Sequence, residues 1–298
     1  PPRSTLFPYT TLFRSGWRRN VFFVDDNFIS NKRQLKEEIL PALIAWRRGR
    51  AGCSYLTEAS INLADDEELM GMMSEAGFNS VFVGIETPDE ASLAECNKGQ
   101  NVHRNLVECV QAMQRHGLQV MGGFIVGFDN DTESIFDRQI EFIQKSGVVT
   151  AMVGMLQAIP GTPLFARLHA EGRITHEMTG DNADGTTNII PAMGLDKLKT
   201  GYARLMAELY SPENFYARIR TCLRLYHPPK APVRLHAAEL YAFLRSIWKL
   251  GTLSAERNHY WRLFFWTLFH RPRSLALAVT FTIYGFHFRT VNALNGIR

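Results

Sequence analysis

The sequence has 298 residues, of which 46% are hydrophobic and 21% are charged, a composition that can bury one large core plus a smaller appended unit. Its four cysteines show no CxxC, CxxxC or HxxxH spacing, which excludes a disulfide framework and a metal knuckle. We therefore expect a globular protein of the reducing cytoplasm, with buried structural thiols at Cys53, Cys96, Cys109 and Cys222.

The net charge of +4 is unevenly distributed along the chain. Residues 216–298 contain thirteen Lys and Arg but only two acidic residues, Glu239 and Glu256, so this segment carries +11 and the remainder −7. A basic segment rich in arginine and aromatic residues indicates an anionic partner, either a membrane surface or nucleic acid. A solvated helical face is the alternative. Of these partners we expect peripheral contact with an anionic membrane, and no nucleic acid.

The first fifteen residues show no usable structural pattern. PPRSTLFPYTTLFRS lacks the charged and apolar regions of a signal peptide and resembles a translated sequencing adapter. We therefore treat residues 1–15 as non-native and expect the natural sequence to resume near Gly16. Towards the other end, the apolar run 275–288 is interrupted by Thr280, Thr282 and His287. This run is too short for a bilayer span, but it is long enough to lie on a membrane.

Short apolar runs alternate with helical patterns along residues 21–170. The helical patterns end at glycines such as Gly77, Gly117 and Gly147, the residue type that most often follows a helix. Repeated strand–helix units require parallel strands with right-handed crossovers, hence an α/β fold that is either a doubly wound sheet or a barrel. The predicted strands are 21–24, 54–57, 80–85, 119–126 and 149–156, and the predicted helices are 32–47, 65–75, 102–116, 132–145 and 164–170.

The pattern changes after Ile174. A polar, glycine-rich loop at 179–188 is followed by helical patterns only, and the proline-rich segment 227–232 reads as a rigid hinge between two helical groups. We therefore divide the chain into the non-native segment 1–15, an α/β unit at 16–175, a linker at 176–194 and a helical domain at 195–298.

Polar side chains follow each predicted strand. The carboxyl ends of parallel strands meet at one edge of the sheet, where such folds place their reactive groups. For any single residue, service as a helix N-cap is an equally good interpretation, but five clusters together favour a site. The residues at the strand ends are Asp25, Asp26, Asn27, Thr57, Glu58, Glu86, Thr87, Gly127, Asp129 and Gln157.

Two of these strand ends are the most informative. Glu86 follows a fully apolar strand, and Pro88 forces the chain to turn just after it. In Gly122–Gly127, small residues within one strand let another molecule approach the backbone, although a simple bulge is the alternative. These glycines lie inside a strand rather than between a strand and a helix, so they are not a dinucleotide-binding fingerprint.

The runs VFFVDDNF, GIETPDEASL, GFIVGFDNDTE and IPGTPL, in this order and spacing, resemble the radical S-adenosylmethionine (SAM) superfamily. The closest resemblance is to members that also carry an N-terminal cobalamin-binding domain. It covers residues 16–173, and YSPENFYARIRTCL is similar to the helical C-terminal extension of the same group. The resemblance implies a partial (β/α)6 radical SAM barrel that lacks its first strand, followed by an all-helical C-terminal extension.

The resemblance also implies a set of cofactor-binding residues. Gly123, Ile125 and Gly127 match the family's Gly-x-Ile-x-Gly strand, beside the adenine of SAM, and Glu86 matches the contact to the ribose. Asp25, Asp26 and Asn27 occupy the strand edge that faces the methionine moiety, and Glu58 at the next strand end completes the set. Asn130 stands where the family often has a glutamate.

The family binds its [4Fe-4S] cluster through CxxxCxxC after the first strand, and this chain has no such triplet. We therefore predict an N-terminally truncated, inactive fragment. The intact parent would use SAM, a [4Fe-4S] cluster, cobalamin and an electron donor. It would form a 5′-deoxyadenosyl radical, abstract hydrogen from an unactivated carbon and methylate a lipid or other hydrophobic substrate. Methylation of hopanoid lipids is a family precedent.

Two other functions are compatible with the same residues. One is a divalent-metal aldolase or hydrolase with Asp25, Asp26 and Glu86 as oxygen ligands. The other is a non-catalytic module that binds a nucleoside and docks on a membrane through the basic tail. The expected docking residues are Arg218, Arg220, Arg224, Arg245, Lys249, Arg257, Arg262, Arg271 and Arg273, with Trp261, Phe264, Phe265, Trp266 and Phe269 interleaved.

Overall fold

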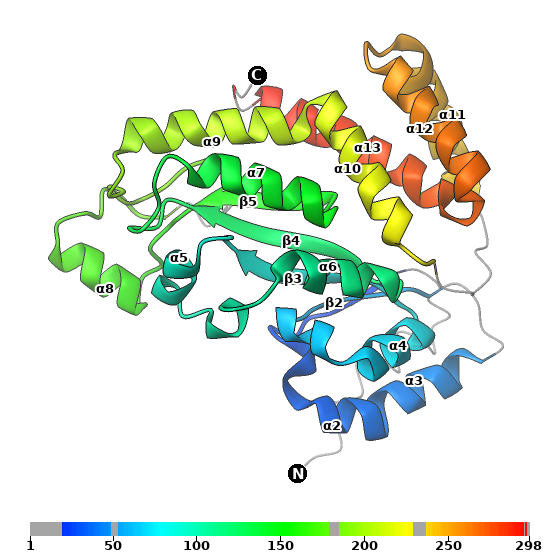
Figure 1. The fold of residues 1–298 in the computed structure, drawn as a ribbon, viewed down its shortest axis with the longest axis horizontal. Helices are drawn as coiled ribbons and strands as arrows, with labels where there is room; N and C mark the ends of the chain where they lie inside the picture. The colour runs from blue at the N-terminus through cyan, green and yellow to red at the C-terminus, as the bar shows by residue number, and fades with distance from the viewer. Residues whose placement is uncertain (1–19, 49–52, 179–184, 229–236, 295, 297–298) are drawn as a thin grey trace.

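Five parallel strands form a single sheet in the computed structural model (Figure 1). The structure describes residues 20–48, 53–178, 185–228, 237–294 and 296. The adapter-like segment 1–15, much of the 179–188 loop and most of the 227–232 hinge therefore lie outside the described residues. The strands are β1 (Val21–Phe23), β2 (Tyr55–Glu58), β3 (Phe78–Glu86), β4 (Gln119–Val126) and β5 (Thr150–Met155).

The strand order decides between the two α/β folds that the sequence left open. Each strand pairs with the next one along the chain, in the order β1-β2-β3-β4-β5, with no reversal. A doubly wound sheet reverses its order at a switch point, whereas a barrel keeps adding strands in the same direction. The sheet is therefore a barrel-type sheet, and β1 and β5 are its edges among the described residues.

Helices cover one face of this sheet, which we call the outer face (Figure 1). Alternate strand residues such as Val81, Val83 and Ile85 point into this layer and are fully buried. Asp66 and Asp89 cap α4 and α5 by accepting hydrogen bonds from backbone N–H groups. The helical segments here are η1 (Phe28–Asn31), α2 (Lys32–Gln34), η2 (Leu35–Ile39), α3 (Leu40–Arg47), η3 (Ile61–Asp65), α4 (Glu67–Ala76), α5 (Glu90–Glu95), η4 (Gly99–Asn101), α6 (Leu106–Arg115) and α7 (Ile135–Ser146).

The opposite face of the sheet, the inner face, is much less covered. Phe22 and Met152 are 42% and 48% exposed, and Phe82, Gly123 and Ile125 are half-buried. Because buried and partly exposed residues alternate along each strand, the sequence pattern produces a sheet with one packed face and one accessible face.

A helix from the C-terminal part of the chain covers the β5 edge. Helix α9 (Leu195–Tyr210) places Tyr202 and Tyr210 so that their hydroxyls donate to the carbonyls of Val153 and Ala151, at 3.1 and 2.6 Å. These bonds satisfy β5 carbonyl groups that another strand would otherwise have to pair with.

Residues on both sides of 179–184, in and next to the predicted linker at 176–194, make contacts near the strand ends. Ile174 and Ile189 form an antiparallel bridge, and the Asn188 amide exchanges two hydrogen bonds with the backbone of Ala158. These contacts, with α8 (Pro163–Ala170), build a small second core beside the strand ends, which includes Phe128, Leu156 and Leu168.

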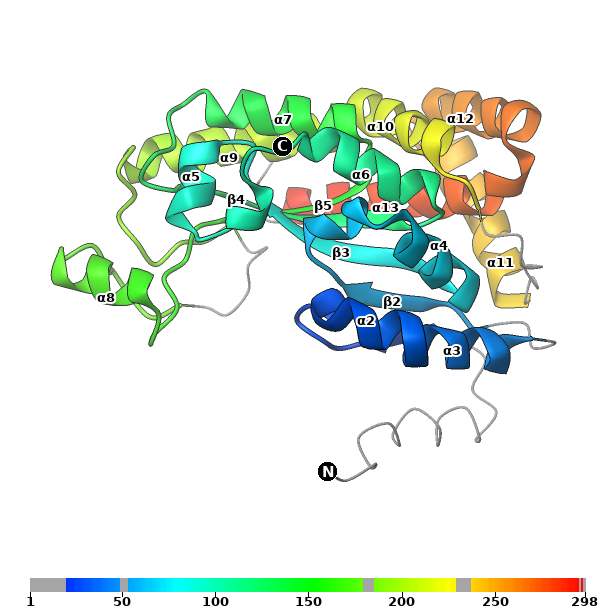
Figure 2. The same ribbon diagram turned by 60° about the horizontal axis from the view of Figure 1, so that its bottom comes forward.

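The rest of the described chain is mainly helical, as predicted. None of the helices in the described part of the chain is both long and apolar enough to cross a membrane. In both views the α11 and α12 helices lie at the end of the molecule opposite α5 and α8 (Figures 1 and 2). The elements are α10 (Pro212–Leu225), α11 (Ala237–Ser246), η5 (Ile247–Leu253), α12 (Arg257–His270), η6 (Pro272–Ser274) and α13 (Leu275–Leu294).

Candidate cofactor-binding site

Glu86 is the centre of the candidate site on the inner face. It is the last residue of β3 and has a φ of +66°, a left-handed conformation that is uncommon for a residue with a side chain. Its carboxylate lies 2.8 Å from Lys98 Nζ, and the two side chains are 13% and 33% exposed. A β-carbon on Gly84 would lie 2.6 Å from Glu86 Oε1 and 2.9 Å from Lys98 Nζ. Gly84 therefore provides the space in which this ion pair lies.

Two buried amides hold the backbone of this strand end in place. Gln139 of α7 donates through Nε2 to the carbonyls of Ile125 and Glu86, at 2.8 and 3.3 Å. Asn101 donates through Nδ2 to the carbonyl of Ile85 at 3.1 Å. Because strained backbone persists only where its surroundings fix it, these bonds explain how Glu86 keeps its conformation.

Two glycines lie side by side on neighbouring strands of the inner face, next to Glu86. Gly84 and Gly123 are paired across β3 and β4, and a β-carbon on Gly123 would lie 3.0 Å from the Phe82 ring. Ile125 lies two residues further along β4 and packs against the second core. A carboxylate beside an aromatic ring and small residues suits the adenosine part of SAM, which offers hydroxyls and a flat base.

Gly127 has a different environment from Gly123. It follows the end of β4 with a φ of +105°, and a β-carbon there would lie 3.0 Å from Leu198 of α9. Its N–H donates to Asp131 Oδ2 at 2.8 Å, and the Phe128 N–H donates to the same oxygen. Gly127 is thus required by the turn itself, and a substitution there would disturb folding before it tested cofactor binding.

The other predicted contacts are spread along the sheet. Asp25 and Asp26 follow β1 and are exposed. Asn27 Oδ1 accepts hydrogen bonds from Ser60 N and Oγ, at 3.1 and 3.2 Å, so this amide ties two strand ends together. Glu58 ends β2 in register with Phe82, which places it on the inner face, half-buried.

Three further strand-end residues do not face an open site. Thr57 is buried and donates to the Phe23 carbonyl, and Thr87 is also buried. Asp129 pairs with Arg173 and Arg167, at 2.5 and 2.6 Å. The hydrogen bond from Arg173 is the main reason that the pKa of Asp129 lies below its usual value of 3.8. The prediction that all five strand ends supply reactive groups to one opening is therefore wrong for Thr57, Thr87 and Asp129.

The cysteines and carboxylates do not form a metal centre. Among the described residues, no group of three His, Cys, Asp or Glu side chains is placed to bind a metal ion. Asp25, Asp26 and Glu86 are not brought together, which removes the ligand set of the metal-dependent alternative. Burial raises the thiol pKa of Cys96 and Cys109, and that of Cys222 to about 12. The cysteines of this chain therefore do not fit a [4Fe-4S] cluster, which needs several thiolates at one place.

The sequence interpretation missed Gly84, Lys98, Asn101 and Gln139. The spacing of Gly84 and Glu86 on one face was available as a signal, because strand residues two apart share a face. Lys98, Asn101 and Gln139 reach the site from loops and a helix, and no local pattern marks them.

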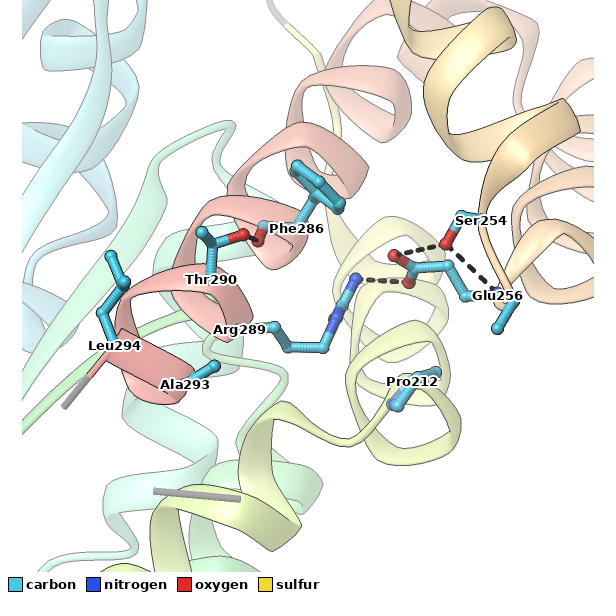
Figure 3. A pocket seen from close by; sticks show the side chains of 9 residues that line it. Pro212, Ser254, Glu256, Phe286, Arg289, Thr290, Ala293 and Leu294 are labelled. Carbon is cyan, nitrogen blue, oxygen red and sulfur yellow. Dashed lines mark hydrogen bonds and ion pairs between the residues drawn. The ribbon is translucent and has the colours of Figure 1, made fainter. Parts of the chain in front are cut away.

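A separate hollow of about 510 Å³ lies among the C-terminal helices, away from the sheet (Figure 3). Its walls are mainly apolar, but they include an ion pair between Arg289 and Glu256. Arg289 also donates to the Tyr210 carbonyl and lies over the Phe215 ring. The pair thus joins α13 to the α9–α10 junction and to the start of α12.

Comparison with known protein families finds a match for each part of the chain. Residues 10–143 match the model of the radical SAM superfamily. Residues 162–295 match a domain of unknown function, DUF4070. These matches confirm the resemblance and the helical C-terminal part.

Full-length relatives give a finer comparison. The chain is 37% identical over 293 residues to the uncharacterized methyltransferase sll1242 of Synechocystis sp., covering 96% of this chain and 54% of the relative. It is 32% identical over 273 residues to the hopanoid C-2 methylase of Rhodopseudomonas palustris, covering 88% and 50%. This chain thus spans about half the length of both relatives.

The fold is also similar to a solved structure. TsrM from Kitasatospora setae is a radical SAM methyltransferase, whose structure contains cobalamin and a [4Fe-4S] cluster. It superposes with a TM-score of 0.56 at 13% identity, covering 97% of this chain and 56% of TsrM. The likeness confirms the radical SAM barrel fold with a helical C-terminal part.

Proposed function

We propose that the intact protein is a cobalamin-dependent radical SAM methyltransferase that acts on an unactivated carbon of a lipid or other hydrophobic substrate. The observation that carries the proposal is the inner face of the sheet. There, the carboxylate of Glu86 lies with Gly84, Gly123 and the Phe82 ring on the accessible face of a barrel that resembles the radical SAM superfamily. The hopanoid C-2 methylase of Rhodopseudomonas palustris among its relatives supports carbon methylation.

The residues of this chain bind and orient the nucleoside part of SAM. Gly123 and Ile125 lie under the adenine, and Glu86, oriented by Lys98, accepts hydrogen bonds from the ribose hydroxyls. Asp25, Asp26, Asn27 and Glu58 form the side towards the methionine moiety. SAM, together with a [4Fe-4S] cluster and cobalamin bound by residues beyond this chain, supplies the radical methylation chemistry. The barrel positions the reacting groups and excludes water.

The substrate class is proposed from relatives and composition. A hopanoid is a lipid, and the Rhodopseudomonas relative is a hopanoid C-2 methylase. The intact enzyme would work in the cytoplasm, with an electron donor, at or near a membrane. The 298-residue chain alone is expected to be inactive because its cysteines do not fit the cluster.

A chimera tests this function. Residues 20–298 would be joined to the part of the Synechocystis relative that this chain does not span, and the product reconstituted without oxygen with iron, sulfide and cobalamin. We expect SAM-dependent formation of 5′-deoxyadenosine and transfer of a labelled methyl group to a bacterial lipid extract. Glu86→Gln should lower both rates, whereas Glu75→Gln, an exposed carboxylate on α4, should not. A chimera that contains the cluster but neither cleaves SAM nor methylates lipid would contradict the proposal.

A further inference from the structure

The hairpin formed by α11, η5 and α12, residues 240–270, exposes an unusual number of large apolar side chains. Eight of the seventeen large hydrophobic residues that are exposed in the described part of the chain lie here. Soluble surfaces rarely carry contiguous apolar patches of this kind without a binding role. The eight are Leu240, Tyr241, Leu244, Trp248, Leu253, Phe265, Leu268 and Phe269.

These side chains are not needed to hold the hairpin together. The contact between α11 and α12 uses Phe243 and Phe264, whose rings stack at 6.1 Å, and a 3.0 Å hydrogen bond between Ser246 and Tyr260. On α11, the spacing i, i+1, i+4 places Leu240, Tyr241 and Leu244 on one helix face. On α12, the spacing i, i+3, i+4 does the same for Phe265, Leu268 and Phe269. Each helix thus has an apolar stripe that is left exposed.

The charges of the hairpin are almost all positive and unpaired. Arg245, Lys249 and Arg262 are exposed, and none forms an ion pair with a described residue. Within residues 240–270 the single carboxylate, that of Glu256, is 5% exposed and is paired with Arg289. A surface that combines cations without an ionic partner with exposed aliphatic and aromatic side chains is complementary to a bilayer whose headgroups are anionic. Nucleic acid would satisfy the cations but not the apolar stripes.

We propose that the α11–α12 hairpin docks on an anionic lipid membrane. The hairpin lies at the end of the molecule opposite α5 and α8, so docking leaves the strand ends of the barrel free (Figures 1 and 2). The proposal concerns attachment and does not depend on the reaction or on a lipid substrate.

The structure corrects the set of docking residues expected from sequence. Arg218 is 1% exposed, it donates to the Leu209 carbonyl, and burial lowers its pKa to about 10. It cannot contact a membrane. Trp261 and Trp266 are half-buried, and Trp261 donates to the Gly251 carbonyl. Phe265 and Phe269 remain candidates, and the α11 stripe with Trp248 adds residues that the sequence interpretation overlooked.

Cosedimentation of the 298-residue protein with vesicles is the test. We expect binding to phosphatidylcholine vesicles that contain phosphatidylglycerol, little binding to phosphatidylcholine alone, and loss of binding as salt shortens the screening length from about 10 Å to about 3 Å. Binding to both vesicle types equally, or to neither, would overturn the proposal. The latter result would favour a protein partner or a second copy of the chain on this surface.

Variants of exposed residues make the test specific to the hairpin. The triple variant Arg245→Gln, Lys249→Gln, Arg262→Gln should weaken binding to anionic vesicles at least about tenfold. The control Lys145→Gln, Lys197→Gln, Lys199→Gln removes the same charge from exposed lysines on α7 and α9 and should change binding less than about twofold. Equal weakening by both sets would show a net-charge effect and refute a defined docking surface.

A fluorescence measurement tests the apolar stripe separately. Trp248 is 62% exposed, so brominated lipid chains should quench its emission when the protein binds. Trp248→Phe should remove most of this quenching while vesicle binding persists. Binding without any difference in quenching between the two proteins would mean that the apolar stripe does not enter the bilayer, which contradicts the proposed docking.

Discussion

The α/β unit and the C-terminal helices use charged residues in opposite ways. Fourteen of the seventeen ion pairs among the described residues lie within the α/β unit, two join it to α9, and one lies within the C-terminal helices. In the first region, carboxylates and cations neutralise each other across loops and helices. In the second, most cations have no acidic neighbour in the sequence. The two regions therefore differ in whether their charges are neutralised within the fold or remain available to a ligand.

Within the α/β unit, one ion pair differs from the others. Glu86 and Lys98 lie on the accessible face beside two glycines, whereas pairs such as Arg104–Asp65 and Arg138–Asp89 connect loops and helices. Exposed pairs of the second kind contribute little free energy. The location of the Glu86–Lys98 pair, on strained backbone held by buried amides, indicates a functional role for it.

The largest expected effect is an all-or-none one on metal content. Anaerobic treatment of the 298-residue protein with iron and sulfide should leave no cluster. The reason is that the thiols are poor ligands here: Cys53 and Cys222 are buried, and the pKa of Cys96 and Cys109 is raised. Iron and sulfide analysis after gel filtration measures this. A variant with all four cysteines changed to serine is the control. More iron on the unmodified protein than on this variant would refute the expectation.

The single ion pair of the C-terminal helices should matter more for stability than an exposed pair of the α/β unit. Glu256→Gln leaves the Arg289 guanidinium partly buried without its counter-ion, and we expect a loss of about 3 kcal/mol in the free energy of unfolding. Urea denaturation measures it. Glu141→Gln breaks the exposed pair with Lys145 and is the matched control, for which no measurable change is expected. Similar losses in both variants would show that burial of the pair is irrelevant.

The Glu86–Lys98 pair should act as a unit in cofactor binding. Glu86→Gln should weaken binding of S-adenosylhomocysteine by about 1 to 3 kcal/mol, the range for losing a charged hydrogen-bond partner. Lys98→Met should weaken binding less, because it leaves the Glu86 carboxylate in place but without the ammonium group that orients it. Isothermal titration of the two single variants and the double variant gives their coupling energy. Additive effects, or an unchanged affinity in Glu86→Gln, would place the nucleoside elsewhere. Glu75→Gln is the neutral control.

Much of the fold could be predicted because it depends on local patterns. The apolar runs of β3 and β4 are typical of strands buried in parallel sheets, and the glycines that end α4 and α7, Gly77 and Gly147, have positive φ as helix C-caps do. The strand order could not be predicted from periodicity, because every parallel arrangement uses the same strand–helix repeat. It required the pairing of distant residues.

The site was only partly predictable for the same reason. Glu86, Gly123 and Ile125 lie on strands, where alternation fixes the face, whereas Lys98 reaches Glu86 from a loop twelve residues later. Arg218 shows the opposite error. An arginine in an amphipathic helix is normally exposed, but here it is packed against the rings of Tyr210 and Phe215. Side-chain burial of this kind depends on which helices meet, which composition does not reveal.

The smallest expected effect concerns how α8 is attached to the α/β unit. Arg173 and Arg167 bind Asp129, and the hydrogen bond from Arg173 is the main cause of its lowered pKa. A carboxyl group whose pKa is lower in the folded state stabilises the fold above its unfolded pKa, and this contribution is lost as the pH falls through the lowered value. The attachment of α8 should therefore weaken between about pH 4 and the lowered pKa of Asp129.

Hydrogen exchange followed by mass spectrometry can measure this local effect. As the pH falls below about 4, peptides from α8 should lose protection before peptides from α7 do. The reason is that Asp129 is the common partner of Arg167, on α8, and Arg173, just after α8. In Asp129→Asn, α8 should already be poorly protected at neutral pH and should show little further pH dependence. If α8 and α7 instead lose protection together in both proteins, the ion pairs of this region do not act locally, and acid unfolding involves the α/β unit as a whole.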